Sequence, residues 1–266
     1  MHPAPRASSP PPRSLSPREH GAYGQLGLPM LAALGAGRPG VAAVLLSAGG
    51  WALFLGYEPA LVLLGRRGER LQTEERPRAM ARLVGLALAG ACLGGAGLVL
   101  APAPVRSAVV LPLVLGAAFA VTVALGQERS LVGEALAALA LAGVSYPVAI
   151  ACGLTAGAAA RAWCVWALGF GALLVPVRSI GARRRAGTSL ATRSAPVLLA
   201  LGTALVLLHA GFRAGDVLAL APLLAAAAWF AVAPPEPRSL PRVGWTVVGA
   251  GLLSAAVLIV LARLRR

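Results

Sequence analysis

Long apolar runs separated by short polar segments dominate the pattern of hydrophobic and polar positions along the chain. A helix that crosses a membrane needs about 20 mainly apolar residues. Runs close to that length lie at 22–37, 41–65, 83–102, 107–126, 131–153, 162–178, 195–212, 215–233 and 243–262. The pattern therefore predicts an all-α fold, a polytopic transmembrane helical bundle of about nine helices, with eight as the alternative count.

The N-terminal segment differs in composition from the rest of the chain. Residues 1–17 are rich in Pro, Ser and Arg and lack the apolar stretch of a signal peptide. We expect them to form a disordered cytoplasmic tail. Residues 18–266 are expected to form a single transmembrane helical domain, because the Gly and Ala residues throughout the apolar runs let helices pack closely in lipid.

The arginines indicate how the helices are oriented, because cytoplasmic loops of membrane proteins are enriched in basic residues. With the N-terminus inside, the outer loops contain only Arg38, Arg106, Arg161 and Arg213, and most of the remaining arginines fall in cytoplasmic segments. The arginines of residues 263–266 lie outside in a nine-helix arrangement and do not follow the rule. We therefore expect a multi-pass protein of a cytoplasmic membrane with a cytoplasmic N-terminus, and the side of the C-terminus stays open; the family resemblance given below implies that this membrane is bacterial.

Composition and charge support this class and narrow the expected partners. Hydrophobic residues make up 58% of the sequence and charged residues 12%, whereas about a quarter of a soluble domain is charged. The formal net charge is +15, and the basic residues lie between apolar segments. We therefore expect the lipid bilayer and anionic lipids as partners and no nucleic acid. The sequence does not indicate an oligomeric state.

Two glutamates lie within the predicted spans, where an ionised group usually faces the interior of the bundle. Glu58 lies near the cytoplasmic end of the second run, and Glu134 lies one turn into the fifth. His20, Tyr23 and Arg178 lie at the same predicted level. These five residues are our candidates for a cytoplasm-facing pocket, and their catalytic roles are unknown.

Two other interpretations of the glutamates stay open. In one, Glu58 and Glu134 pair with arginines such as Arg82 or Arg178 and stabilise helix packing. In the other, they lie at the interface and extend towards water. At the opposite end we expect an ion pair at the rim among three residues: His209, Arg213 and Asp216.

Four arginines are candidates for anion binding: Arg76, Arg183, Arg184 and Arg185. Guanidinium groups match the geometry of phosphate and need no metal ion to bind it. The alternative interpretation is that these arginines act only as a positive-inside signal that contacts anionic lipids.

Two stretches resemble the YwiC-like family of bacterial membrane proteins. The chain reads SPREHGAYGQLGLPMLAALGAG at 16–37, with a PREHGAW-like opening to the first helix, and ERSLVGE at 128–134. The resemblance implies a multi-pass membrane protein and does not imply a particular activity.

A more distant resemblance is to UbiA-type intramembrane prenyltransferases, which have nine helices and two Asp-rich motifs. TEERPRAMARLVG at 73–85 is similar to the tail of the first motif, and 177–202 is similar to the second. In those enzymes the aspartates hold Mg²⁺. Here Ser179 and Arg183 stand near the acidic positions of the second motif, and the sole aspartate of the chain is Asp216. We therefore expect a UbiA-like arrangement with no metal site and no cofactor.

Three functions follow as hypotheses. The first is a bundle without UbiA chemistry that holds a lipid or isoprenoid in a cytoplasm-facing pocket. The second is a prenyltransferase with a degenerate Mg²⁺ site built from Glu58, Glu69 or Glu134. The third is a small-solute or proton-coupled transporter in which Glu58, Glu134 and His20 titrate.

Overall fold

The computed structural model describes residues 15–17, 20–182, 212–233, 235 and 240–265. All of the regular secondary structure in these residues is helical. The helices are α1 (His20–Ala36), α2 (Val41–Leu55), α3 (Tyr57–Leu63), α4 (Glu69–Leu100), α5 (Ala103–Ala108), α6 (Val110–Ala124), α7 (Leu131–Gly143), α8 (Ser145–Ala151), α9 (Ala156–Ala182), α11 (Ala214–Val232) and α12 (Leu240–Leu264).

Seven helical stretches in the described residues are long and apolar enough to cross a membrane. They are Val41–Leu63, Glu69–Leu100, Ala103–Ala124, Leu131–Ala151, Ala156–Arg178, Ala214–Val232 and Arg242–Leu264. Together with α1, a shorter helix of 17 residues, they correspond to eight of the predicted runs. The run at 195–212 lies outside the described residues. The prediction of a polytopic helical bundle is confirmed, whereas the total of nine helices stays a prediction.

Three of the crossings consist of two helices each, and a proline explains each division. The prolines and the last residues of the helices before them are Pro59 with Leu55, Pro112 with Ala108, and Pro147 with Gly143. In each case the helix ends four residues before the proline. This is the residue whose carbonyl would accept the missing N–H of proline and would collide with its ring. Pro222 lies inside α11 without dividing it, so the local sequence does not decide every division.

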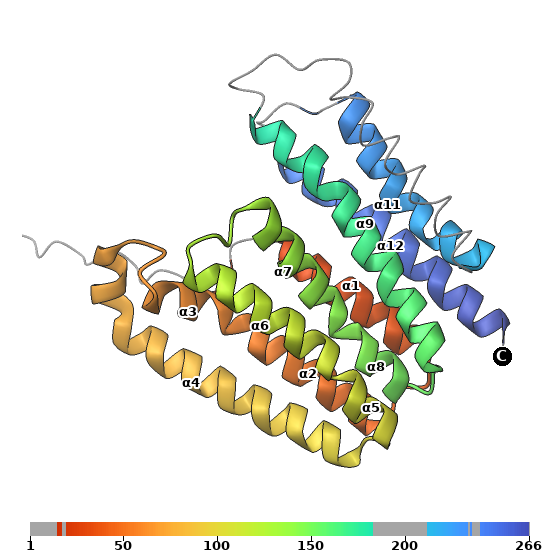
Figure 1. The fold of residues 1–266 in the computed structure, drawn as a ribbon, viewed down its shortest axis with the longest axis horizontal. Helices are drawn as coiled ribbons and strands as arrows, with labels where there is room; N and C mark the ends of the chain where they lie inside the picture. Colours follow the sequence, from red (N-terminus) through yellow and green to blue (C-terminus); the bar gives the residue numbers. More distant parts are fainter. Residues whose placement is uncertain (1–14, 18–19, 183–211, 234, 236–239, 266) are drawn as a thin grey trace, which may run out of the picture.

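The helices run in alternating directions and form one bundle (Figure 1). α4 lies along one side and α11 on the opposite side, with α1 and α7 between them. α2 and α4 approach closely, and a Cβ built at Gly49 would lie 2.8 Å from the backbone nitrogen of Gly94. Around α9, α11 and α12 the core consists of larger side chains, including Trp166, Phe170 and Phe230.

The outer faces of α4 and α6 are apolar and exposed. Only 11% of the most apolar window of α4 is buried, and Leu88 and Val99 on α4 are 60% and 76% exposed. Leu113 and Val114 on α6 are similarly exposed. A surface of this kind is unfavourable in water and suits lipid chains, as the apolar runs predict.

The alternating helices create two polar ends. The Glu58 end comprises the start of α1, the turn between α3 and α4, the turn between α6 and α7, and the end of α9. The Asp216 end comprises the end of α1, the start of α9, the start of α11 and the end of α12. In Figure 1 these ends lie at the upper left and the lower right.

Candidate functional site

Glu58 forms a buried ion pair with an arginine close to it in the chain. It lies in the first turn of α3 and is 1% exposed. Arg67, in the turn between α3 and α4, donates from Nε to Oε1 at 2.9 Å and from Nη2 to Oε2 at 2.6 Å. This two-point contact satisfies both carboxylate oxygens and ties α3 to the turn that follows it.

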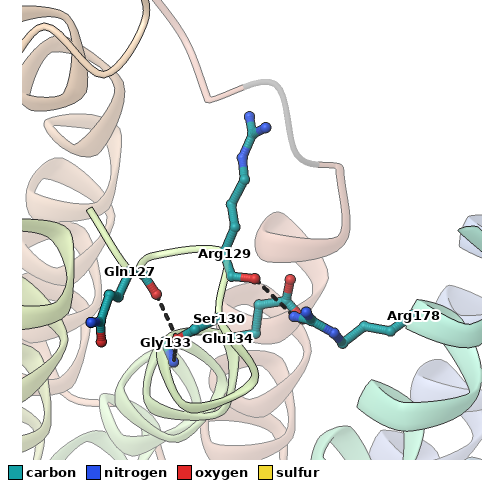
Figure 2. A network of polar contacts seen from close by, with 6 residues as sticks. All are labelled: Gln127, Arg129, Ser130, Gly133, Glu134 and Arg178. Carbon is teal, nitrogen blue, oxygen red and sulfur yellow. Dashed lines mark hydrogen bonds and ion pairs between the residues drawn. The ribbon is translucent and has the colours of Figure 1, made fainter. Parts of the chain in front are cut away.

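Glu134 forms a more exposed ion pair that joins two crossings (Figure 2). Its Oε2 lies 2.8 Å from Nη1 of Arg178 at the end of α9, and the two side chains are 36% and 41% exposed. The same Arg178 nitrogen donates to the carbonyl oxygen of Arg129 at 2.9 Å. α7 is therefore linked to α9 through one guanidinium group.

The turn between α6 and α7 is held by its own hydrogen bonds. The Ser130 hydroxyl caps α7 by accepting the N–H of Gly133 at 3.0 Å, and it donates to the carbonyl of Gln127 at 2.7 Å. A Cβ at Gly133 would collide with that same carbonyl oxygen. These contacts explain why serine at position 130 and glycine at position 133 suit the turn formed by the ERSLVGE stretch.

Arg66 adds a further connection at this end. Its Nη2 donates to the carbonyl oxygen of Ala124 at 2.6 Å, so the turn between α3 and α4 reaches the end of α6. The guanidinium lies over Gly126, where a Cβ would be 3.0 Å from Arg66 Cζ. Gly126 also has φ of +73°, a conformation that favours glycine.

The other predicted residues at the Glu58 end lie in different surroundings. Tyr23 packs against Phe54, with ring centroids 5.0 Å apart, and more loosely against Trp51. Arg76 is exposed on α4. His20 begins α1, but its side chain is not described. Three predicted anion-binding residues lie outside the described residues: Arg183, Arg184 and Arg185.

The structure therefore brings together some of the predicted residues and not others. Glu134 and Arg178 form a pair, as the packing interpretation predicted. Glu58 pairs with Arg67, a partner that the sequence did not indicate, and Arg82 instead donates to the Ser16 hydroxyl at 3.2 Å. The two glutamates thus have separate arginine partners. Their convergence on one cytoplasm-facing pocket stays a prediction.

A cavity of about 350 Å³ lies at the opposite end, between α1, α8, α9, α11 and α12. Among its lining residues are Arg161, Arg213, Asp216, Arg265 and Trp166. Asp216 Oδ2 accepts the backbone N–H of Arg213 at 3.0 Å and lies 3.2 Å from Arg161 Nε. Asp216 thus forms an ion pair with Arg161, which lies outside the predicted set, and Arg213 contacts it through its backbone N–H.

Sequence analysis missed the role of Arg161 because it treated this residue only as an outer-loop arginine. The positions of Arg161 and Asp216 near the starts of their helices could have indicated this pair. Arg161 lies within the first two turns of α9, and Asp216 lies in the first turn of α11. Both helices start at the same end, so an arginine early in α9 was a candidate partner for the carboxylate early in α11. His209, the third member of the predicted set, lies outside the described residues.

The described residues contain no group of three or more His, Cys, Asp or Glu side chains suited to holding a metal ion. Most of the stretch at 177–202 that is similar to the second UbiA motif lies outside the described residues. No match was found among curated proteins or solved structures. The resemblance to UbiA-type enzymes therefore gains no support from the comparisons.

The family comparison gives a match. A family model described as YwiC-like protein matches residues 16–150, from the segment before α1 into α8. The matched part contains HGAYG at the start of α1, the Glu58–Arg67 pair, the turn between α6 and α7, and Glu134. Its first segment and its ERSLVGE turn are the two stretches whose sequence resembles this family. The chain belongs to the YwiC-like family.

Proposed function

We propose that this YwiC-like protein binds the phosphate head group of an anionic lipid at its Glu58 end, without prenyltransferase chemistry. In this proposal the protein resides in a bacterial cytoplasmic membrane, the Glu58 end is cytoplasmic, and an isoprenoid phosphate is one such lipid. The apolar part of the lipid stays in the bilayer, beside the exposed faces of the helices.

The observation that supports this proposal most is a row of arginines across three elements. Arg66 comes from the turn between α3 and α4, Arg129 from the turn between α6 and α7, and Arg178 from the end of α9. The carboxylates at this row are Glu128 and Glu134, and Glu134 is already engaged by Arg178. Arg66 and Arg129 are exposed, so their remaining N–H donors are accessible to a phosphate at the membrane surface.

Two of the four arginines of α4 are paired with carboxylates of the same helix. Arg70 pairs with Glu74 at 2.7 Å, and Arg78 pairs with Glu75 at 2.8 Å, all on α4. These pairs have little net charge to offer to a lipid. The proposal therefore assigns lipid binding to the arginine row and not to Arg70 and Arg78 of α4.

The test uses the full chain in nanodiscs with spin-labelled phosphatidylglycerol or phosphatidylcholine as the probe. We expect more immobilised phosphatidylglycerol than phosphatidylcholine. The variant Arg66→Gln/Arg129→Gln should lose most of this preference, by about 1 kcal/mol per arginine. Chelation of divalent cations should leave the preference unchanged, because guanidinium groups bind phosphate directly.

The control variant Arg70→Gln/Arg78→Gln makes the same change in charge at the same end. We expect it to keep most of the lipid preference. An equal loss in both variants would show diffuse attraction in place of a site, and no preference in the parent protein would overturn the proposal. A reporter domain fused to the N-terminus checks the orientation separately.

A further inference from the structure

The cavity at the Asp216 end contains more positive than negative groups. Three arginines line it, Arg161, Arg213 and Arg265, against the single carboxylate of Asp216. Asp216 is 6% exposed, and the Arg161 side chain is 24% exposed. Solvent screens charge poorly beside these two side chains, whereas Arg213 and Arg265 are exposed. The excess of guanidinium groups over carboxylates favours a bound anion.

Two buried N–H donors at the cavity have no acceptor in the described part of the chain. They are Arg161 Nε and Trp166 Nε1. The Arg161 atom is 3.2 Å from Asp216 Oδ2, but the contact is not aligned as a hydrogen bond. Trp166 is 1% exposed, so water does not readily replace the missing acceptor. Buried donors are normally paired, and an oxyanion supplies several acceptor atoms at once.

The ends of the helices around the cavity also favour a bound anion. α9, with 27 residues, and α11, with 19, both begin at this cavity, and helix N-termini favour negative charge. α12 ends here with the opposite dipole, with Arg263 in its last turn and Arg265 directly after its end. Arg265 reaches the start of α11, because a Cβ at Gly215 would lie 2.7 Å from its Nη2. Arg263 Nε donates to the carbonyl of Gly35 at 3.2 Å.

Apart from Ser145 and Thr155, the rest of the cavity wall is apolar and rich in alanine. Ala32 and Ala36 of α1, Ala159 and Ala162 of α9, and Leu258 of α12 contribute to it. A volume of about 350 Å³ lies in the range of sites for small organic ligands and exceeds the need of a bare oxyanion. The polar and apolar walls together fit a head group with an attached hydrocarbon chain.

We infer that the cavity at the Asp216 end is a binding site for the phosphate group of an amphipathic molecule. The phosphate contacts Arg161, Arg265 and the indole N–H of Trp166, and the alanine wall holds the start of the hydrocarbon chain. Asp216 competes with this anion for Arg161. The site is separate from the proposed arginine row, since it lies at the other end of the bundle.

The experiment titrates octyl phosphate into the full chain in nanodiscs of phosphatidylcholine and measures binding by calorimetry. We expect saturable binding, and we expect Arg265→Gln and Arg161→Gln each to weaken it by about tenfold. Asp216→Asn should tighten it by about threefold, because it removes the competing charge. The asparagine oxygen can still accept the N–H of Arg213. The matched control is Arg106→Gln, an exposed arginine at the same end that donates to carbonyls of α4 and should have no effect.

Further arms identify the source of the phosphate group. Phosphatidic acid in the nanodisc that blocks octyl phosphate would assign the site to a membrane lipid, and binding without competition would assign it to a soluble amphiphile. Inorganic phosphate that binds as tightly as octyl phosphate would overturn the amphipathic ligand. Absence of binding, weaker binding in Asp216→Asn, or equal losses in Arg265→Gln and Arg106→Gln would overturn the site. If Arg161→Gln does not fold, the binding measured with Arg265→Gln and Asp216→Asn still tests the proposed site.

Discussion

The two ends of the bundle use arginine in different ways. At the Glu58 end, carboxylates of the protein form ion pairs with arginines, as in the Glu58–Arg67 and Glu134–Arg178 pairs. At the Asp216 end, one carboxylate faces three arginines around a cavity. The two ends also differ in their buried polar atoms that have no hydrogen-bond partner in the described residues. At the first end this atom is an acceptor, Glu128 Oε2, whereas at the second the atoms are donors, Arg161 Nε and Trp166 Nε1.

This difference shows that burial, and not the number of arginines, decides what an arginine does. Arg67 is nearly enclosed and needs its carboxylate partner, so the pair serves the fold. Exposed arginines such as Arg129 are solvated and remain available to lipid head groups. Around the cavity, Arg213 and Arg265 are exposed, but the buried donors Arg161 Nε and Trp166 Nε1 have no acceptor in the described residues, and we infer that a ligand supplies one.

The largest expected effect concerns the buried pair at the Glu58 end. Glu58→Gln should lower the free energy of unfolding by about 3–5 kcal/mol, because it leaves Arg67 without a carboxylate in a buried place. Unfolding in mixed micelles, followed by circular dichroism, measures this loss. The double variant Glu58→Met/Arg67→Met should recover at least half of it. A loss below about 1 kcal/mol in the single variant would contradict a structural role for the pair.

An intermediate effect should separate the two proposed anion sites by their response to salt. Raising the ionic strength from about 0.05 to about 0.5 M shortens the Debye length several-fold and screens exposed charges most. The lipid preference at the arginine row should fall by about tenfold, whereas octyl phosphate binding in the cavity should fall by about threefold or less. Equal salt dependence would contradict the difference in enclosure between the two ends.

The smallest expected effect concerns the exposed pair at the Glu58 end. Glu134→Gln should cost about 0.5 kcal/mol of stability, because both members of its pair with Arg178 are more than a third exposed. The same unfolding measurement as for Glu58→Gln checks this value. A cost as large as that of Glu58→Gln would mean that exposure does not separate structural pairs from interfacial ones.

Sequence reasoning was strongest where the cause is local. The apolar runs identified the membrane crossings, since the length of a run reflects the thickness of the bilayer. Three interpretations of Glu134 were open, and its pairing with Arg178 agrees with the packing interpretation. The divisions before Pro59, Pro112 and Pro147 also follow from a local rule, although Pro222 lies inside an undivided helix and shows that the rule does not hold everywhere.

Sequence reasoning was weaker where partners depend on how turns and helices meet. One interpretation paired Glu58 with arginines such as Arg82 or Arg178, but the turn after α3 places Arg67 against it. Arg161 and Asp216 are far apart in the chain, and only the neighbouring positions of α9 and α11 bring them together. No periodic pattern in one helix reports the orientation of another.

The sequence by itself determined that this is a multi-pass membrane protein of the YwiC-like family, because apolar length and a short local motif are properties of the chain. Only the tertiary structure decided which charges neutralise one another and where a cavity remains. Five helices line that cavity, and their packing leaves Arg161 Nε and Trp166 Nε1 without hydrogen-bond acceptors in the described residues. Burial and distance between remote segments are properties of the folded bundle, so no stretch of the sequence contains them.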